Sequence, residues 1–191
     1  MTITDLQAGY GPSGFDVRQR FVESYIYELP LGPGKRWLNR GGVVGKVIGG
    51  WQQEGIVTFS GGRAFTVFLN QGVNNGAPSW PNRICSGVLG NAGPSMWFNT
   101  SCFVAPPPNT FGNSQRGVLY GPGQSNFDLS FVKNTTVTER TKLEFRLDAF
   151  NIFNTPFFGF PNPNIGSPTA GQITSTNTDM RDLQFSLKLT F

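Results

Sequence analysis

The residues best suited to acid–base chemistry stand at alternating positions of two short segments. Asp128 lies in NFDLSF, and Glu144, Arg146 and Asp148 lie in KLEFRLDAF. Paired carboxylates can act as general acid and base. However, the sequence has no histidine, which excludes Ser-His-Asp and Cys-His mechanisms and removes the commonest metal ligand. We therefore interpret the alternating polar residues as the wall of a β-sheet, and predict no enzyme, no catalytic residue, no metal site and no cofactor.

The two cysteines, Cys85 and Cys102, both lie in the longest stretch without regular alternation, at about residues 70–125. If that stretch is extracellular, its environment is oxidising and a disulfide is expected. The bond would close a loop of about 17 residues and contribute roughly 3 kcal/mol. Two free thiols are the alternative. Two cysteines without histidine are too few ligands for a metal site.

Two glycine-rich stretches resemble nucleotide-binding motifs but lack their context. GYGPSG has the glycines of a dinucleotide fingerprint, yet a strand pattern follows where a helix is required, so we predict a periplasmic turn. GGVVGK has Arg40 where a phosphate loop needs glycine, and Val47 where it needs serine or threonine. Neither stretch is predicted to bind phosphate. The glycines of the first stretch are Gly9, Gly11 and Gly14.

Six segments alternate between apolar and polar residues with period 2, which is typical of strands with one apolar and one polar face. The clearest is DLQFSLKLTF, in which every odd-numbered residue is apolar. Helix-forming residues are sparse, whereas glycine and proline are frequent. The pattern predicts an all-β antiparallel meander of about six to eight strands. The segments are 15–30, 47–59, 65–69, 126–137, 141–153 and 182–191.

The connections between these segments alternate between long and short. The connections at 30–42, about 70–125 and 155–180 are long, whereas SGGR at 60–63 and TER at 138–140 are tight. Short periplasmic turns and long extracellular loops are typical of outer-membrane barrels. This layout predicts a membrane barrel with the C-terminus on the periplasmic side. Six strands are too few for a closed barrel, so we expect a C-terminal segment of a larger one.

The register predicts which face meets lipid. With odd-numbered residues toward lipid, Arg146 and Lys188 face the lumen. A slip of one residue would turn both toward lipid, at about 2–4 kcal/mol each near the midplane. The same alternation would also suit a soluble, half-buried sheet. Aromatic residues fit the barrel: Tyr25 and Tyr27 are expected in an interfacial girdle near the outer end of the first strand, and Trp80 and Trp97 inside the long loop.

Several stretches together resemble the last part of TonB-dependent outer-membrane receptors, especially the Oar-like subgroup. They are FDVRQRFVESYIYELPLGPGK, GGWQQEGIVTFSGGRAFTV, the segment from WFNTSCF to FVKNT, FRLDAFNIFNTPFFGFPN and QFSLKLTF. The resemblance covers about residues 5–191. It implies a large barrel with a plug domain and uptake of scarce, bulky solutes. It also implies that the last strand is read by the barrel-assembly machinery, through Phe185, Leu187, Leu189 and Phe191.

We expect residues 1–191 to form a partial barrel domain that lacks the plug, a signal peptide and the coupling segment. The expected partners are outer-membrane lipid, the barrel-assembly machinery, the remainder of the barrel and the plug. An inner-membrane energy-coupling complex would act only through that plug. Nucleic acid is not expected, because the net charge is only +4 and the basic residues are scattered. The alternatives are a surface-displayed, adhesin-like barrel and a soluble β-sandwich binding module.

Overall fold

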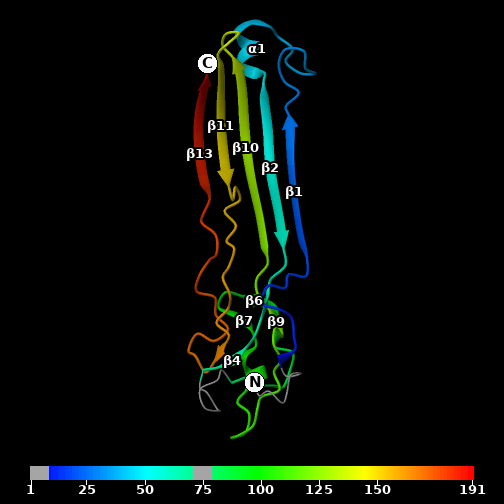
Figure 1. Cartoon of the computed structure of the whole chain (residues 1–191), viewed down its shortest axis with the longest axis vertical. Helices are drawn as coiled ribbons and strands as arrows, with labels where there is room; N and C mark the ends of the chain where they lie inside the picture. The colour runs from blue at the N-terminus through cyan, green and yellow to red at the C-terminus, as the bar shows by residue number, and fades with distance from the viewer. Residues whose placement is uncertain (1–8, 71–78) are drawn as a thin grey trace. The chain divides into compact units, whose positions relative to one another are not determined.

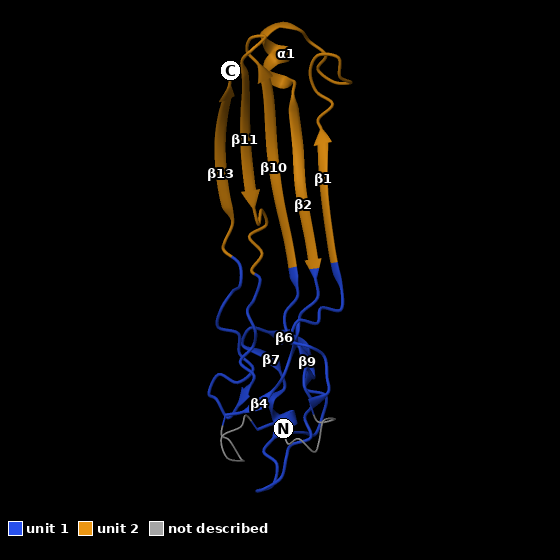
Figure 2. Ribbon diagram, in the orientation of Figure 1, with its two compact units in different colours: residues 1–20, 60–124, 157–178 blue, residues 21–59, 125–156, 179–191 orange. Residues whose placement is uncertain are grey.

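The computed structural model describes residues 9–70 and 79–191, which fall into two compact units. The sheet unit comprises residues 21–59, 125–156 and 179–191, and the loop unit comprises the described parts of 1–20, 60–124 and 157–178 (Figure 2). Within the described residues, no helix is long and apolar enough to cross a membrane.

The sheet unit is built on a five-stranded sheet in the order β1-β2-β10-β11-β13. The strands alternate in direction, so each one runs antiparallel to its neighbours (Figure 1). An antiparallel meander was expected from the period-2 pattern, and this part of the prediction is confirmed. The strands are β1 (Arg20–Glu28), β2 (Trp51–Ser60), β10 (Gln124–Thr136), β11 (Lys142–Phe150) and β13 (Asp182–Thr190).

The register of the sheet keeps odd-numbered residues on one face. Leu147 on β11 lies opposite Phe131 on β10 and opposite Phe185 on β13. Arg146 lies opposite Val132 and Ser186. Directly opposed residues in an antiparallel pair point to the same face, so the apolar and polar sets that alternate along each strand also align across the sheet.

The predicted strand at residues 65–69 is not part of this sheet. Its residues form two short strands, β3 (Ala64–Phe65) and β4 (Phe68–Leu69), which belong to the loop unit. β3 pairs with β9 (Leu119–Tyr120), and β4 pairs in parallel with β12 (Asn164–Ile165). The expected hairpin at SGGR was therefore wrong. The chain leaves β2 and returns to the sheet only at β10.

The connections are sorted to the two ends of the sheet, but not as expected. The turn at 137–141 is tight, with the Val137 N–H donating to the Thr141 carbonyl at 2.9 Å. The C-terminus lies at the same end, because Thr190 pairs with Lys142. The connection 29–50, which contains α1 (Gly42–Ile48), also lies there, since the Asn134 N–H donates to Gly50 at the start of β2. The prediction of 30–42 as a loop at the opposite end was wrong.

Two further expectations about position were wrong for the same reason. β1 ends at Glu28, beside the start of β2, where the Leu29 N–H donates to the Trp51 carbonyl at 2.9 Å. Tyr25 and Tyr27 therefore lie toward the end of the sheet that carries the tight turn. The GYGPSG stretch does not lie at that end. It belongs to the loop unit, where the α-carbon of Gly11 lies so close to Arg116 that a Cβ would meet its carbonyl oxygen at 2.1 Å.

The loop unit has its own small hydrophobic core, drawn from segments far apart in the sequence. Paired short strands surround it: β5 (Asn82–Arg83) with β8 (Phe103–Val104), and β6 (Val88–Gly93) with β7 (Met96–Phe98). Trp97 packs against this core, as predicted for a residue of the long loop. The buried members are Phe65, Val67, Phe98, Cys102, Phe103 and Leu119.

Candidate functional site

The odd-numbered face of the sheet is largely apolar and aromatic, although it also carries the polar side chains of Glu23, Gln53 and Lys133. The Phe59 ring meets Phe127 edge-on, with centroids 5.4 Å apart, and packs against Phe21 on the neighbouring strand. The Trp51 ring contacts Phe145 across β10. In water such a face would be costly, because large apolar patches normally require a partner or a lipid environment. The apolar face therefore indicates contact with an apolar medium.

The opposite face carries a network of ion pairs centred on Arg146. Its guanidinium lies 3.1 Å from Oε2 of Glu54 and 2.8 Å from Oδ1 of Asp148, and it donates to Oγ of Ser130 at 3.2 Å. The Ser130 hydroxyl in turn donates to Asp148. Because Asp148 is only 9% exposed, its charge needs these donors. The network links three strands and stabilises the predicted register.

This polar face is hollowed into a shallow cavity of about 450 Å³. Asp128 also lies on its wall, where it accepts hydrogen bonds at 2.8 Å from the Asn126 side chain and from the Asn151 backbone. Such a surface offers alternating charges and hydrogen-bonding groups to a polar solute. The other lining side chains include Ser24, Ile26, Glu54, Ile56, Arg146 and Asp148.

The predicted carboxylates are only partly brought together. Asp128 and Asp148 line the same cavity, whereas Glu144 lies farther along β11, opposite Asn134 and Lys188. Asp148 is held by an arginine and a hydroxyl, which suits a structural carboxylate. This arrangement agrees with the predicted polar wall.

Sequence reasoning missed the pairing of Glu54 with Arg146. The position of Glu54 on the polar face follows from the alternation along its strand, but the identity of its partner does not. The two residues belong to β2 and β11, which are separated by β10 in the sheet. The two long side chains together bridge that spacing, with the guanidinium 3.1 Å from the carboxylate.

The loop unit contains a disulfide between Cys85 and Cys102, with the two α-carbons 5.0 Å apart. Cys102 is buried in the core against Phe103 and Phe98. The bond joins the two ends of a segment that holds β6 and β7. The paired strands of this segment are thereby fastened to the core.

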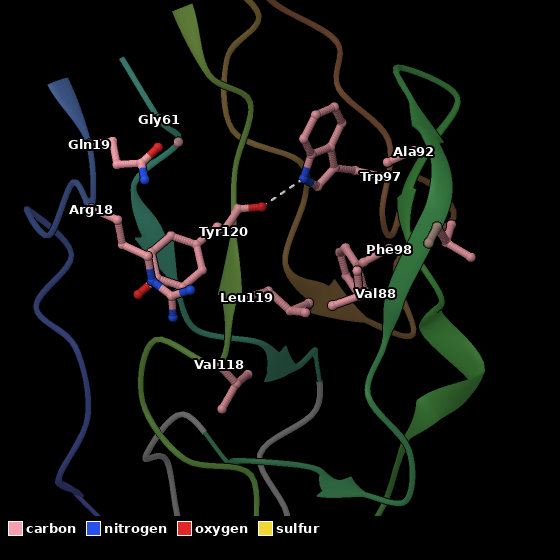
Figure 3. A pocket seen from close by; sticks show the side chains of 12 residues that line it. Arg18, Gln19, Gly61, Val88, Ala92, Trp97, Phe98, Val118, Leu119 and Tyr120 are labelled. Atoms are coloured by element: carbon pink, nitrogen blue, oxygen red, sulfur yellow. Dashed lines mark hydrogen bonds between the residues drawn. The ribbon is translucent and has the colours of Figure 1, made fainter. Parts of the chain in front are cut away.

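A second cavity, of about 560 Å³, lies in the loop unit (Figure 3). The Trp97 indole N–H donates to the Tyr120 carbonyl at 2.8 Å, and the Tyr120 hydroxyl donates to Asp16 at 3.0 Å. The Arg18 guanidinium lies 4.1 Å from the centroid of the Tyr120 ring, a cation–π contact. Apolar side chains such as Val88 and Leu119 form much of the remaining wall. This cavity can receive an apolar group beside a positive charge.

The last strand presents its expected apolar residues on one face but leaves them uncovered within the described residues. Phe185, Leu187 and Leu189 are all exposed on β13, opposite Leu147, Phe145 and Leu143 respectively. Phe191 lies beyond the strand and is 95% exposed. Its side chain therefore contributes little to the packing of the described residues.

Within the described residues, no group of three or more histidine, cysteine, aspartate or glutamate side chains could hold a metal ion.

Comparison with known proteins gives one family. A family model for an outer membrane beta barrel domain matches residues 1–184. No curated protein and no solved structure matches the chain. The matched residues include β1, β2, β10 and β11 in full and β13 only as far as residue 184, and an outer-membrane location accounts for the apolar face. The chain belongs to the outer membrane beta barrel domain family.

Proposed function

We propose that this chain forms part of the barrel wall of a TonB-dependent transporter that takes up a solute across the outer membrane. The observation that carries the proposal is the contrast between the two faces of one sheet. An aromatic face suited to lipid lies opposite a face whose charges are joined through Arg146. Polar interiors are typical of barrels that pass or bind solutes.

The sheet alone does not close, so the proposal includes a larger barrel. Among the described residues, β1 and β13 each have one neighbour in the sheet. Unpaired strand edges in lipid cost several kcal/mol for each unsatisfied backbone group. In the proposed transporter, further strands pair with both edges. The remainder of the barrel and a plug complete the lumen, and an inner-membrane complex supplies energy through the plug.

The loop unit would stand at the extracellular side of this barrel. The connections that build it, 61–123 and 151–181, leave the sheet at the end opposite the tight turn at 137–141. Short turns lie on the periplasmic side of bacterial barrels. The disulfide fits the oxidising conditions outside the cell. The loop-unit cavity would then be a first contact site for the incoming solute.

Uptake in cells tests this function. A strain that lacks the gene is compared with its parent on a panel of radiolabelled solutes too large for porins, with and without collapse of the proton-motive force. We expect at least one solute whose uptake requires both the gene and the proton-motive force. If the strain that lacks the gene takes up every solute of the panel as well as its parent does, the proposal is contradicted.

A second candidate function is surface adhesion, which is favoured by the disulfide-fastened fold of the loop unit. A mutant that lacks residues 70–123, so that β10 stays whole, separates the two functions. Lost adhesion with intact uptake would favour display, whereas lost uptake would favour transport. Membership of an outer-membrane family argues against the soluble β-sandwich alternative.

A further inference from the structure

The connection between β1 and β2 carries positive charge without compensating carboxylates. Residues 29–50, here called the α1 segment, contain four basic residues and no aspartate or glutamate. The adjacent Glu28 pairs with Lys35 at 2.9 Å. The other three cations have no ion pair among the described residues, and are available to an external anion. They are Arg36, Arg40 and Lys46.

The helix in this segment turns its apolar side outward. Val43, Val44 and Val47 are 78%, 50% and 61% exposed, whereas Gly45 is buried. Gly45 is needed on the inner side, because a Cβ there would meet the Arg40 carbonyl oxygen at 2.1 Å. A helix on a water-facing surface normally shows the reverse orientation, with apolar residues inward. The three exposed valines therefore indicate that this side of the helix contacts an apolar medium.

Two side chains of the lipid-facing side of the sheet hold the helix in place. The Trp51 indole N–H donates to the Val47 carbonyl at 3.2 Å, and the Lys133 ammonium donates to the Lys46 carbonyl at 2.9 Å. Trp51 contacts Phe145, and Lys133 lies opposite Phe145 in the register. Both donors thus belong to the apolar face. The helix lies at the end of the sheet with the tight turn (Figure 1).

We propose that the α1 segment binds anionic phospholipid headgroups at the membrane interface, with its valines inserted just beneath them. The exposed valines continue the apolar face of the sheet, which itself meets lipid. Arg36, Arg40 and Lys46 would face the phosphate groups, as basic residues beside an apolar helix face do in interfacial helices. Trp37, which is exposed next to these cations, suits the same depth.

A fluorescent label placed on the helix tests its contact with lipid. The full chain with Val43→Cys is labelled with NBD while the native disulfide stays oxidised, and Glu139→Cys in the tight turn serves as the matched control. Both variants are titrated in zwitterionic detergent with dibrominated phosphatidylglycerol or dibrominated phosphatidylcholine. We expect phosphatidylglycerol to quench the label at position 43 at lower concentration than at position 139, and at lower concentration than phosphatidylcholine does. Val47→Cys should behave like Val43→Cys.

Neutralising the cations tests the headgroup contact. The combined change Arg36→Gln, Arg40→Gln and Lys46→Gln should raise the half-quenching concentration of phosphatidylglycerol roughly 100-fold, at about fivefold for each cation near an anionic surface. Arg116→Gln, in the loop unit, should leave it unchanged. Equal quenching at positions 43 and 139, equal quenching by the two lipids, or an unchanged titration in the triple variant would each overturn the proposal.

Discussion

Placing the same charge on either face of β13 separates lipid contact from lumen contact. Phe185→Lys puts an ammonium group on the apolar face, and Gln184→Lys puts it on the polar face, one residue away. Both side chains are exposed and both belong to the same strand. Any difference between the variants therefore reports the surroundings of the two faces, and strand propensity or distance along the chain contributes little.

The expected difference follows from the position of these residues. β13 runs from Asp182 to Thr190, so Phe185 lies one residue, or about 3.4 Å, from its centre. A lysine near the bilayer midplane costs about 2–4 kcal/mol. Loss of the phenylalanine from lipid adds about 1.5–3 kcal/mol, for a total of roughly 3.5–7 kcal/mol. Gln184 lies opposite Asp148, so a lysine there should change stability by less than about 1 kcal/mol.

Equilibrium unfolding measures this difference without involving assembly in the cell. The full chain and both variants are reconstituted in phospholipid vesicles and unfolded in urea, with tryptophan fluorescence as the signal. Phe185→Leu serves as a control that keeps the site apolar and should cost less than about 1.5 kcal/mol. Equal destabilisation by the two lysines, or a greater loss from Gln184→Lys, would refute the assignment of the apolar face to lipid.

Three further predictions follow from the structure. Arg146→Met should lower the free energy of unfolding by about 1–3 kcal/mol, because the nearly buried Asp148 loses its charged donor; urea unfolding in vesicles measures this, and no loss would contradict the network. Replacing both cysteines with alanine should cost the loop unit about 3 kcal/mol; limited proteolysis should then cut residues 79–124 faster, and unchanged cleavage would count against a stabilising disulfide. Deleting Phe191, which is 95% exposed, should change unfolding by less than about 0.5 kcal/mol but reduce the amount of protein in the outer membrane; equal amounts would argue against an assembly signal.

The strands of the sheet were predictable because their alternation is local. Each strand shows on its own which residues share a face, and the register of β11 with β13 keeps the two faces continuous. The disulfide was expected because both cysteines lie in the long connection, which was expected to face the oxidising environment outside the cell. The polar wall was also expected, although the contact between Glu54 and Arg146 depends on the order of strands in the sheet.

The segment at 65–69 shows the limit of periodicity. Phe65, Val67 and Leu69 alternate like the residues of a membrane strand, but Val67 is completely buried inside the loop unit. Alternation identifies an apolar side without saying whether lipid or protein covers it. Here the deciding contact is distant in sequence: Ala64 pairs with Tyr120, and no local residue announces that pairing.

Helix α1 was missed because its sequence has no usual helix signal. It is only seven residues long, and Gly41 at its start provides no side-chain cap. Two carbonyl groups of the helix accept hydrogen bonds from the side chains of Trp51 and Lys133, which belong to the sheet. Because the loop 30–42 was expected at the wrong end of the sheet, Tyr25 and Tyr27 were expected there too. Tertiary contacts, which the local pattern does not contain, decide each of these positions.

The orientation of the chain in the outer membrane is the central claim, and labelling of intact cells tests it most directly. Single cysteines replace Ser95, between β6 and β7, and Glu139, in the tight turn; both side chains are exposed. A maleimide coupled to a polymer too large to pass porins is added before and after the outer membrane is permeabilised. We predict labelling at position 95 in intact cells and at position 139 only after permeabilisation. The reverse pattern, or equal labelling of both positions in intact cells, would contradict the account.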